Sequence, residues 1–238
     1  MEIQIIVYSL IFLFLLIAVS VYKGYLYQVR QKSFSLNKPE LSVVIAAKNE
    51  EENINSLFES FEKINYPVEK YEVIIVDDSS TDKTYELIKE NIRSKTNYKL
   101  FKADKKKFEG KKGALQSGIE NSKYNLIVIT DADCRPDTHW LTEIAGKLDA
   151  GFDFVFGAAP IISGNLFIQK LAAFENFRNT YLSISAVGLN IPYSASARSF
   201  AFRKNSFNRI GGYSNTTETI SGDDDLLLRE AIKNKLLI

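Results

Sequence analysis

Short apolar runs alternate with amphipathic helical segments along most of this chain, and this alternation constrains the fold more than any other feature. The runs LSVVIAA at 41–47, YEVIIV at 71–76 and LIVIT at 126–130 are rich in β-branched residues and predict strands. Further strands are predicted at 98–103 and 152–158, and helices at about 49–64, 82–92, 111–121 and 139–148. Strands joined through helices form a mostly parallel sheet with helices on both faces, so the pattern predicts an α/β domain.

Polar and acidic residues follow three of these predicted strands. Lys48, Asn49 and Glu50 follow the first strand, the stretch DDSSTD begins at Asp77 after the second, and D-A-D at 131–133 follows the fourth. Asn49 is also the predicted N-cap of the next helix. In open α/β sheets, ligands bind outside the carboxyl ends of the strands. All three groups are therefore expected along one edge of the sheet.

Asp131 and Asp133 end an apolar strand, where unpaired carboxylates are costly and repel each other. A divalent cation such as Mg²⁺ or Mn²⁺ removes this conflict, because both metals prefer oxygen ligands. The chain contains neither G-x-G-x-x-G nor G-x-x-x-x-G-K-[ST], and its first strand-to-helix turn is acidic. Such an acidic turn would repel a pyrophosphate, but the edge can still bind a nucleoside diphosphate if a divalent cation bridges the two.

The bulk composition narrows the partners and cofactors. A formal net charge of +1 gives no general affinity for polyanions, so no nucleic-acid partner is expected. One cysteine, Cys134, and one histidine, His139, exclude an intrachain disulfide and a His/Cys zinc cluster. The charge is uneven, because the stretch 102–112 contains six lysines. This run is interpreted mainly as a solvated loop.

An uncharged segment of twenty residues, from Ile3 to Tyr22, is long enough to cross a membrane, since a helix of this length spans ~30 Å. A cleaved signal peptide is the alternative, but no basic region precedes the segment. The basic residues that follow it are Lys23, Arg30, Lys32 and Lys38. By the positive-inside rule they place the rest of the chain in the cytoplasm. The predicted organisation is a transmembrane helix at 1–22, a juxtamembrane linker at 23–40 and a folded domain at 41–238.

The segment NLFIQKLAAFENFRNTYLSI, at 165–184, has apolar residues near helical spacing. Packing in the core is the expected role of such a helix. An interfacial helix that guides a lipid or sugar acceptor is the alternative.

Six segments, in order along the chain, resemble the motifs of glycosyltransferase family 2, whose catalytic domain has the nucleotide-sugar-binding GT-A fold. They are VVIAAKNEEENI at 43–54, VIIVDDSSTDKT at 73–84, GKKGALQSGI at 110–119, TDADC at 130–134, ARSFAFRKNSFNRIGGYS at 197–214 and SGDDDLLLRE at 221–230. D-x-D alone is a weak signal, but six segments in register are a strong one. Such members usually continue with Q-x-x-R-W and more membrane helices, so the resemblance implies that the C-terminal part of the catalytic domain is missing here.

The resemblance implies how the donor is bound. Asp78 would accept a hydrogen bond from the base of the nucleotide, while Asp77 helps to shape the turn. Lys48 and Glu50 stand at positions that contact the nucleoside in the family, although Ala46 replaces a frequent proline. Lys111 corresponds to the family lysine near the diphosphate.

The resemblance also implies the metal ligand and the base. Asp133 would bind the metal directly, and Asp131 would lie close to the metal, the donor sugar and the ribose. The late acidic motif aligns in two ways: as G-D-D it makes Asp224 the base, and as E-D-x-D-L it makes Asp223 the base. Gly222 favours Asp224. A simple role of this acidic run in starting the following helix is the alternative.

These residues imply inverting transfer of a sugar from a nucleoside-diphosphate sugar, expected to be a UDP-sugar, to a hydroxyl of a lipid or saccharide acceptor. The metal and Lys111 would stabilise the leaving group, and Asp224 would take the proton of the acceptor hydroxyl. Two other functions stay open. They are a metal-dependent nucleotidyltransferase and a nucleotide-sugar-binding module without catalytic activity.

Overall fold

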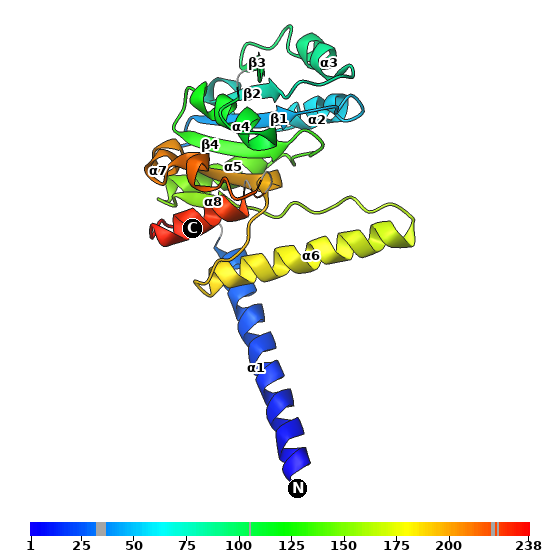
Figure 1. Ribbon diagram of the computed structural model, residues 1–238, viewed down its shortest axis with the longest axis vertical. Helices are drawn as coiled ribbons and strands as arrows, with labels where there is room; N and C mark the ends of the chain where they lie inside the picture. Colours follow the sequence, from blue (N-terminus) through cyan, green and yellow to red (C-terminus); the bar gives the residue numbers. More distant parts are fainter. Residues whose placement is uncertain (32–36, 105, 220–221, 223) are drawn as a thin grey trace. The chain divides into compact units, whose positions relative to one another are not determined.

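The computed structural model describes residues 1–31, 37–104, 106–219, 222 and 224–238. The chain forms two compact units. The larger unit, Ser33–Ala158 with Ala195–Ile238, contains a sheet and its flanking helices (Figure 1). The smaller unit joins the N-terminal helix to the segment Ala159–Ser194.

The larger unit is built on a six-stranded sheet with the order β3-β2-β1-β4-β6-β5. Its strands are β1 Leu41–Ala47, β2 Tyr71–Asp77, β3 Tyr98–Lys102, β4 Leu126–Asp131, β5 Phe154–Phe156 and β6 Phe200–Arg203. β1 to β4 pair in parallel, whereas β6 pairs antiparallel with both β4 and β5. The predicted α/β class with a mostly parallel sheet is confirmed. β6 was not predicted, because a strand of four residues is too short to show a period.

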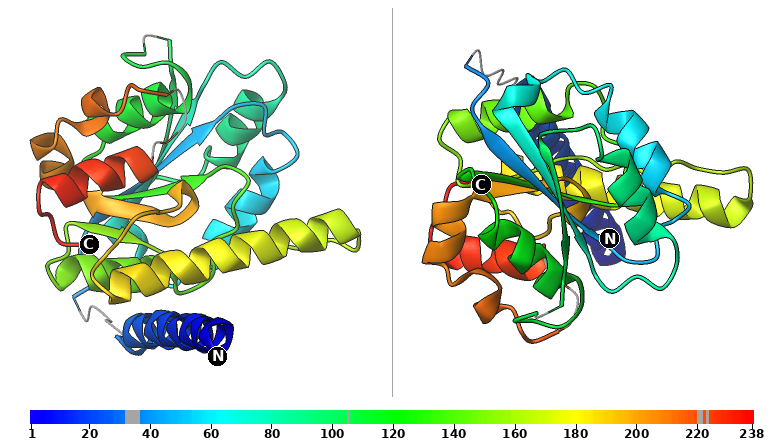
Figure 2. Two further views of the ribbon diagram at one scale, coloured as in Figure 1. Left: turned by 60° about the horizontal axis from the view of Figure 1, so that its bottom comes forward. Right: turned by 90° about the horizontal axis from the view of Figure 1, so that it is seen from above.

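Helices cover both faces of this sheet. On one face lie α2 Ile54–Phe61, α3 Thr84–Asn91 and α5 Trp140–Asp149, and on the other lie α4 Gly110–Glu120, α7 Lys204–Arg209 and α8 Asp225–Lys233 (Figure 2). Three short 3₁₀ helices, η1 Val68–Lys70, η2 Ala197–Ser199 and η3 Gly212–Asn215, complete the unit.

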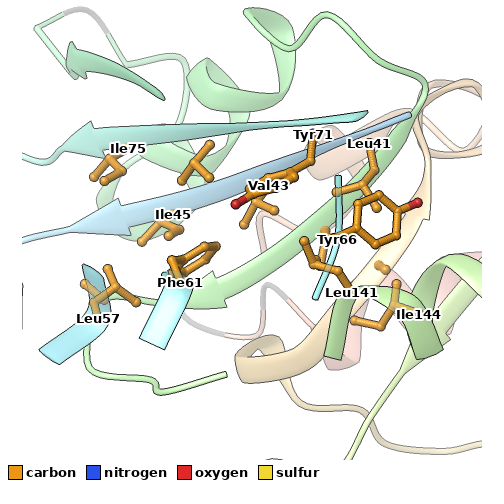
Figure 3. Packing of buried hydrophobic residues seen from close by; sticks show 14 of the residues in the cluster. Leu41, Val43, Ile45, Leu57, Phe61, Tyr66, Tyr71, Ile75, Leu141 and Ile144 are labelled. Atoms are coloured by element: carbon orange, nitrogen blue, oxygen red, sulfur yellow. The ribbon is translucent and has the colours of Figure 1, made fainter. Parts of the chain in front are cut away.

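Alternate side chains of each central strand pack on opposite faces of the sheet. Val43 of β1 packs in one cluster with Phe61 of α2 and Leu141 of α5 (Figure 3). Its neighbour Val44 packs on the other face with Leu115 of α4. Because both faces are covered, these strands are apolar along their length, and their polar residues are concentrated at the ends.

The first helix of the sheet unit begins later than predicted. α2 starts at Ile54 with Asn53 before it, so the prediction that Asn49 is its N-cap is wrong. Asn49 instead adopts the left-handed conformation, with φ 55°, which asparagine tolerates better than most residues. Its side chain bonds to another turn, as described below.

The smaller unit contains two helices, α1 Glu2–Arg30 and α6 Phe167–Gly188. α1 continues past Tyr22, so the residues up to Arg30 that were assigned to a linker are helical. α1 is long and apolar enough to cross a membrane, with a mean hydropathy of 2.7 in its best window, a test that a signal sequence near the N-terminus also passes. A membrane crossing therefore stays a prediction.

α6 does not pack in a core. Phe167, Leu171, Phe174 and Phe177 are exposed, so the expectation of core packing for this segment is wrong. Apolar periodicity indicates that one helix face needs a partner, but it does not tell which partner covers that face. Within its unit, α6 packs against α1 near its C-terminal end.

Candidate active site

The carboxyl ends of β1, β2 and β4 lie side by side at one edge of the sheet. β1 is in the middle: Ala47 pairs with Asp77 on one side, and the residue before it pairs with Asp131 on the other. Adjacent strands are about 4.8 Å apart, so the side chains that follow them share one small surface. The structure thus brings together Lys48, the Asp77–Asp78 pair and Asp131.

The turns after β1 and β2 are bonded to each other. The backbone N–H of Asn49 donates to Ser80 Oγ at 3.0 Å, and the N–H of Thr81 donates to Asn49 Oδ1 at 2.8 Å. The N–H of Glu50 donates to Thr84 Oγ1 at 2.7 Å. These reciprocal bonds satisfy backbone groups that the turns leave without partners, and they fix the turn that presents the two aspartates.

The Asp77 and Asp78 side chains are buried, with residue exposures of 3% and 4%. Asp77 Oδ2 accepts a long hydrogen bond of 3.4 Å from the N–H of Ser80. Asp77 Oδ1 is buried and has no hydrogen-bond partner among the residues that the structure describes. Leaving such an atom unpaired costs about 1–3 kcal/mol, which a donor from outside the chain would offset.

Two lysines of the lysine-rich stretch 102–112 neutralise carboxylates at this edge. Lys106 forms an ion pair with Asp78, and Lys111 Nζ lies 2.6 Å from Asp131 Oδ1. Sequence reasoning selected only Lys111 from this run, and nothing in the spacing of six lysines distinguishes Lys106. Its contact explains how a buried Asp78 is tolerated, because the carboxylate is paired.

Asp131, Asp133 and Cys134 form a cluster whose possible ligand atoms lie within 4.8 Å of one another. The two carboxylates provide hard oxygen ligands of the type that Mg²⁺ and Mn²⁺ prefer, and Asp133 is exposed. Cys134 is a poorer ligand for such metals, and burial raises the pKa of its thiol. The donor set fits a divalent, oxygen-preferring cation.

Asp224 lies at the start of α8 and caps it. Its Oδ1 accepts from the N–H of Asp225 at 2.8 Å, and its Oδ2 accepts from the N–H of Ala197 at 2.9 Å. Asp225 Oδ1 accepts from the N–H of Ala195 at 2.9 Å. The helix-starting role is therefore present. Asp223, the alternative base, lies outside the described residues.

Side chains of α4 and β4 donate hydrogen bonds to the loop before α8 and to η2. Lys112 is buried, and its Nζ donates to the carbonyl oxygens of Thr216 at 2.5 Å and Thr219 at 2.9 Å. Thr130, directly before Asp131, donates through Oγ1 to the carbonyl oxygen of Arg198 at 2.8 Å. Arg198 directly follows Ala197, whose backbone N–H donates to Asp224. The sequence interpretation missed Lys112, because its neighbour matched the motif.

Residues 42–211, more than half of the chain, match the sequence profile described as Glycosyl transferase family 2. The chain belongs to this family. Two curated relatives are similar to this family 2 protein. Glycosyltransferase AglE of Haloferax volcanii is 29% identical over 59% of this chain and 46% of AglE. Beta-monoglucosyldiacylglycerol synthase of Nostoc sp. is 32% identical over 48% of this chain and 24% of the synthase. The chain spans less than half the length of both.

Two solved structures resemble the fold of this family 2 protein. The mannosyltransferase PcManGT from Pyrobaculum calidifontis, in complex with GDP-Man and Mn²⁺, gives a TM-score of 0.63 at 21% identity and covers 92% of this chain and 61% of its own. TarS of S. aureus, in complex with UDP-GlcNAc, gives 0.57 at 20% identity over 81% of this chain and 53% of its own. At such identities the likeness establishes the GT-A type of fold alone.

Two predicted site residues of this family 2 protein lie on the turn after β1. Lys48 is exposed. Glu50 is half-buried, and its Oε2 accepts from Asn53 Nδ2 at 2.8 Å, which gives it a structural role before α2. The contacts of these two residues with a nucleoside stay a prediction.

Proposed function

We propose that this family 2 glycosyltransferase is an inverting, metal-dependent enzyme that moves a sugar from a nucleoside-diphosphate sugar to a hydroxyl group of a lipid or saccharide acceptor. The observation that carries the proposal is the Lys111–Asp131 ion pair beside Asp133, at the carboxyl edge of the sheet. This edge is where ligands of open α/β sheets bind. A ligand that brings a diphosphate and a cation can pair its phosphates with Lys111 and its cation with the two aspartates.

The Asp78–Lys106 pair suits the edge of a nucleotide base. Asp78 would accept from a ring N–H, and Lys106 would donate to the carbonyl oxygen beside that N–H. Uracil presents this N–H and carbonyl edge, so a UDP-sugar is the expected donor, and guanine presents a related edge. The unpaired Asp77 Oδ1 offers an acceptor for a ligand or water next to the base. Lys48 and Glu50 would flank the nucleoside.

The diphosphate is assigned to Lys111, and the cation to Asp133 together with Asp131. Mg²⁺ or Mn²⁺ bound there supplies positive charge that stabilises the departing nucleoside diphosphate. Lys111 is placed to neutralise the same oxygens, because it already reaches Asp131. PcManGT in complex with GDP-Man and TarS in complex with UDP-GlcNAc support a nucleotide sugar as the donor, and the Mn²⁺ in the PcManGT complex supports this metal.

Asp224 is our candidate for the base, with Asp223 as the alternative. Its carboxylate would take the proton from the acceptor hydroxyl as the oxygen attacks the anomeric carbon from the face opposite the diphosphate. The two backbone N–H donors at Asp224 hold its orientation during this step. Because one displacement inverts the anomeric centre, no covalent enzyme intermediate is needed.

The proposed location rests on α1 and on the basic residues that follow its apolar segment. α1 would anchor the enzyme in a membrane, and the basic Lys23, Arg30 and Lys38 would keep the sheet unit in the cytoplasm. The name of the Nostoc relative, a glucosyldiacylglycerol synthase, supports a lipid among the acceptors to be tested.

The test uses the full chain purified in lipid nanodiscs. Calorimetry with UDP and GDP, with and without Mn²⁺, measures binding, and release of nucleoside diphosphate from a panel of UDP- and GDP-sugars measures turnover. We expect binding that requires Mn²⁺ and is lost in Asp133→Asn but kept in the control Asp137→Asn, an exposed acid nearby. Formation of a nucleoside triphosphate and sugar 1-phosphate when pyrophosphate is added to the nucleotide sugar, binding without turnover or absence of binding would each contradict the proposal.

A further inference from the structure

We propose that α6 lies on the surface of the membrane that α1 crosses, with its aromatic face among the lipid headgroups and the upper acyl chains. This inference rests on the proposed membrane anchoring by α1, and it assigns a second lipid-binding surface to the chain. The occupant of this surface is the bilayer itself.

The apolar face of α6 is defined by its spacing. Phe167, Leu171, Phe174 and Tyr181 recur at intervals of four, three and seven residues, so they lie along one side of the helix. The first three are exposed by 81%, 44% and 58%. Three large apolar side chains in a row on one helix face, open to solvent, are unusual in a soluble protein and mark an interaction surface.

The same face of α6 carries α1. The ring centroids of Tyr181 and Tyr25 lie 4.9 Å apart. Four residues further along α6, the carbonyl oxygen of Ser185 is so close to Gly24 that a Cβ atom there would lie 2.3 Å from it. Ser185 follows Tyr181 by one helical turn, so it shares the side of Phe167 and Phe174. The exposed apolar residues therefore continue the face on which α1 is packed.

The crossing point lies at the expected level of a membrane surface. The part of α1 from Glu2 to Gly24 has a length of about 33 Å at 1.5 Å per residue, close to the ~30 Å core of a bilayer. Tyr22, Tyr25 and Tyr27 surround the crossing point, as in the aromatic belts of membrane helices. In Figure 1, α6 runs across the C-terminal end of α1 and not along it. If α1 crosses the membrane, α6 would therefore run along the membrane surface.

The charges on α6 suit an interfacial helix. Lys170 lies on one flank of the apolar face, whereas Arg178 follows Phe174 by four residues and lies within this face, where it forms an ion pair with Glu175. Both basic residues are exposed. Their long side chains can reach the headgroups while their stems cover apolar surface. A lipid bilayer is favoured over a second copy of the chain, because the membrane that surrounds α1 is already next to this face. Interfacial helices of this kind combine an apolar face with basic side chains that reach the lipid headgroups.

The test is fluorescence quenching of the full chain in phosphatidylcholine and phosphatidylglycerol vesicles that contain brominated lipids. Phe174→Trp adds a probe on the apolar face, and the matched control Ala172→Trp adds one on the opposite side of the same helix, where Ala172 is also exposed. The signal of native Trp140 is subtracted with the wild-type protein. We expect brominated lipid to remove most of the fluorescence added by Phe174→Trp and little of that added by Ala172→Trp.

Three results would overturn the inference. No quenching of Phe174→Trp in a chain that resists alkaline extraction from the vesicles would place α6 away from lipid. Equal quenching of both variants would exclude a single lipid-facing side. A dependence on the ratio of protein to lipid would assign the face to a second copy of the chain. Nucleotide release is measured on the same samples, so failure of the enzymatic proposal is distinguishable from failure of this one.

Discussion

Lys111 Nζ and Asp131 Oδ1 lie 2.6 Å apart, and this ion pair joins α4 to the end of β4 at the centre of the candidate site. Their side chains are 34% and 28% exposed. A pair this accessible to water contributes only about 0.2–1 kcal/mol. A diphosphate and a metal ion can therefore displace this ion pair at little cost, because the diphosphate would pair with Lys111 and the metal ion with Asp131.

Removal of Lys111 should have opposite effects on the metal alone and on the nucleotide. In Lys111→Met, we expect Mn²⁺ alone to bind up to ~5-fold more tightly, because no ammonium group competes for Asp131. UDP with Mn²⁺ should bind ~10- to 100-fold more weakly, because hydrogen bonds to charged groups contribute about 1.5–3 kcal/mol. Calorimetry measures both affinities. In the control Lys107→Met, which removes an exposed lysine of the same lysine-rich stretch, neither affinity should change. A parallel loss of both affinities in Lys111→Met would contradict the assignment.

The base assignment predicts a loss of turnover without a loss of donor binding. In Asp224→Asn, sugar transfer should fall by ~10²–10⁴, the usual contribution of a positioned proton acceptor. Binding of UDP with Mn²⁺ should stay nearly unchanged in calorimetry, because the amide cannot take the proton but keeps the shape of the side chain. The control is Asp225→Asn, which removes a neighbouring carboxylate that also accepts from the backbone. Full turnover in Asp224→Asn would exclude this residue as the base.

The strands, their ends and the family could be predicted because their signals are local. LIVIT and YEVIIV are continuous apolar runs, and the parallel connection then requires that the residues after them meet at one edge. The pairing of Ala47 with Asp77 follows from this rule without any knowledge of side-chain contacts.

Contacts within loops could not be predicted in this way. Six lysines in one run carry no period, so the sequence does not tell that Lys106 reaches Asp78 or that Lys112 is buried. Asn49 has the chemistry of an N-cap, but its side chain bonds to Thr81 in another turn, which depends on strand order. The antiparallel β6 depends in the same way on neighbours distant in sequence.

A buried carboxylate at the start of β2 predicts a pH-dependent contribution to stability. Glu72 accepts from Ser42 Oγ and from the N–H of Lys123, both at 2.6 Å, and from Lys99 Nζ at 2.8 Å. Burial alone would raise the pKa of Glu72, but the hydrogen bonds from Lys99, Ser42 and Lys123 outweigh it and hold the pKa below its ordinary value. The charged form therefore stabilises the fold above the unfolded pKa of about 4.3, and this contribution is lost as the pH falls through the lower pKa of the folded state.

Glu72→Gln should accordingly lower the free energy of unfolding by ~1–3 kcal/mol at pH 7, because the charge-assisted hydrogen bonds are lost. The difference from wild type should shrink as the pH falls below about 4. Urea denaturation followed by Trp140 fluorescence measures both values. Glu62→Gln, which removes an exposed partner of Lys95, should have little effect. A difference that grew on acidification would show that Glu72 is not held in its charged form.

Close packing of α1 on α6 predicts an effect of side-chain size at one position. A Cβ atom on Gly24 would lie 2.3 Å from Ser185 O, and one on Gly188 would lie 2.0 Å from Gly24 O, so the two backbones are in contact. Small residues permit such close contacts between helix backbones, and van der Waals packing then stabilises the pair. We expect Gly24→Leu to force the helices apart at the point where α6 joins α1.

The separation can be measured by cross-linking the full chain in nanodiscs. Cysteines replace Tyr25 and Tyr181, whose ring centroids lie 4.9 Å apart, in a Cys134→Ser background. A short thiol cross-linker should join the helices efficiently, and Gly24→Leu should reduce the yield several-fold. Ala18→Leu, an exposed position of α1, is the matched control and should leave the yield unchanged. An undiminished yield in Gly24→Leu would show that α1 and α6 do not pack through this glycine, and the level assigned to α6 at the membrane would then lose its anchor point.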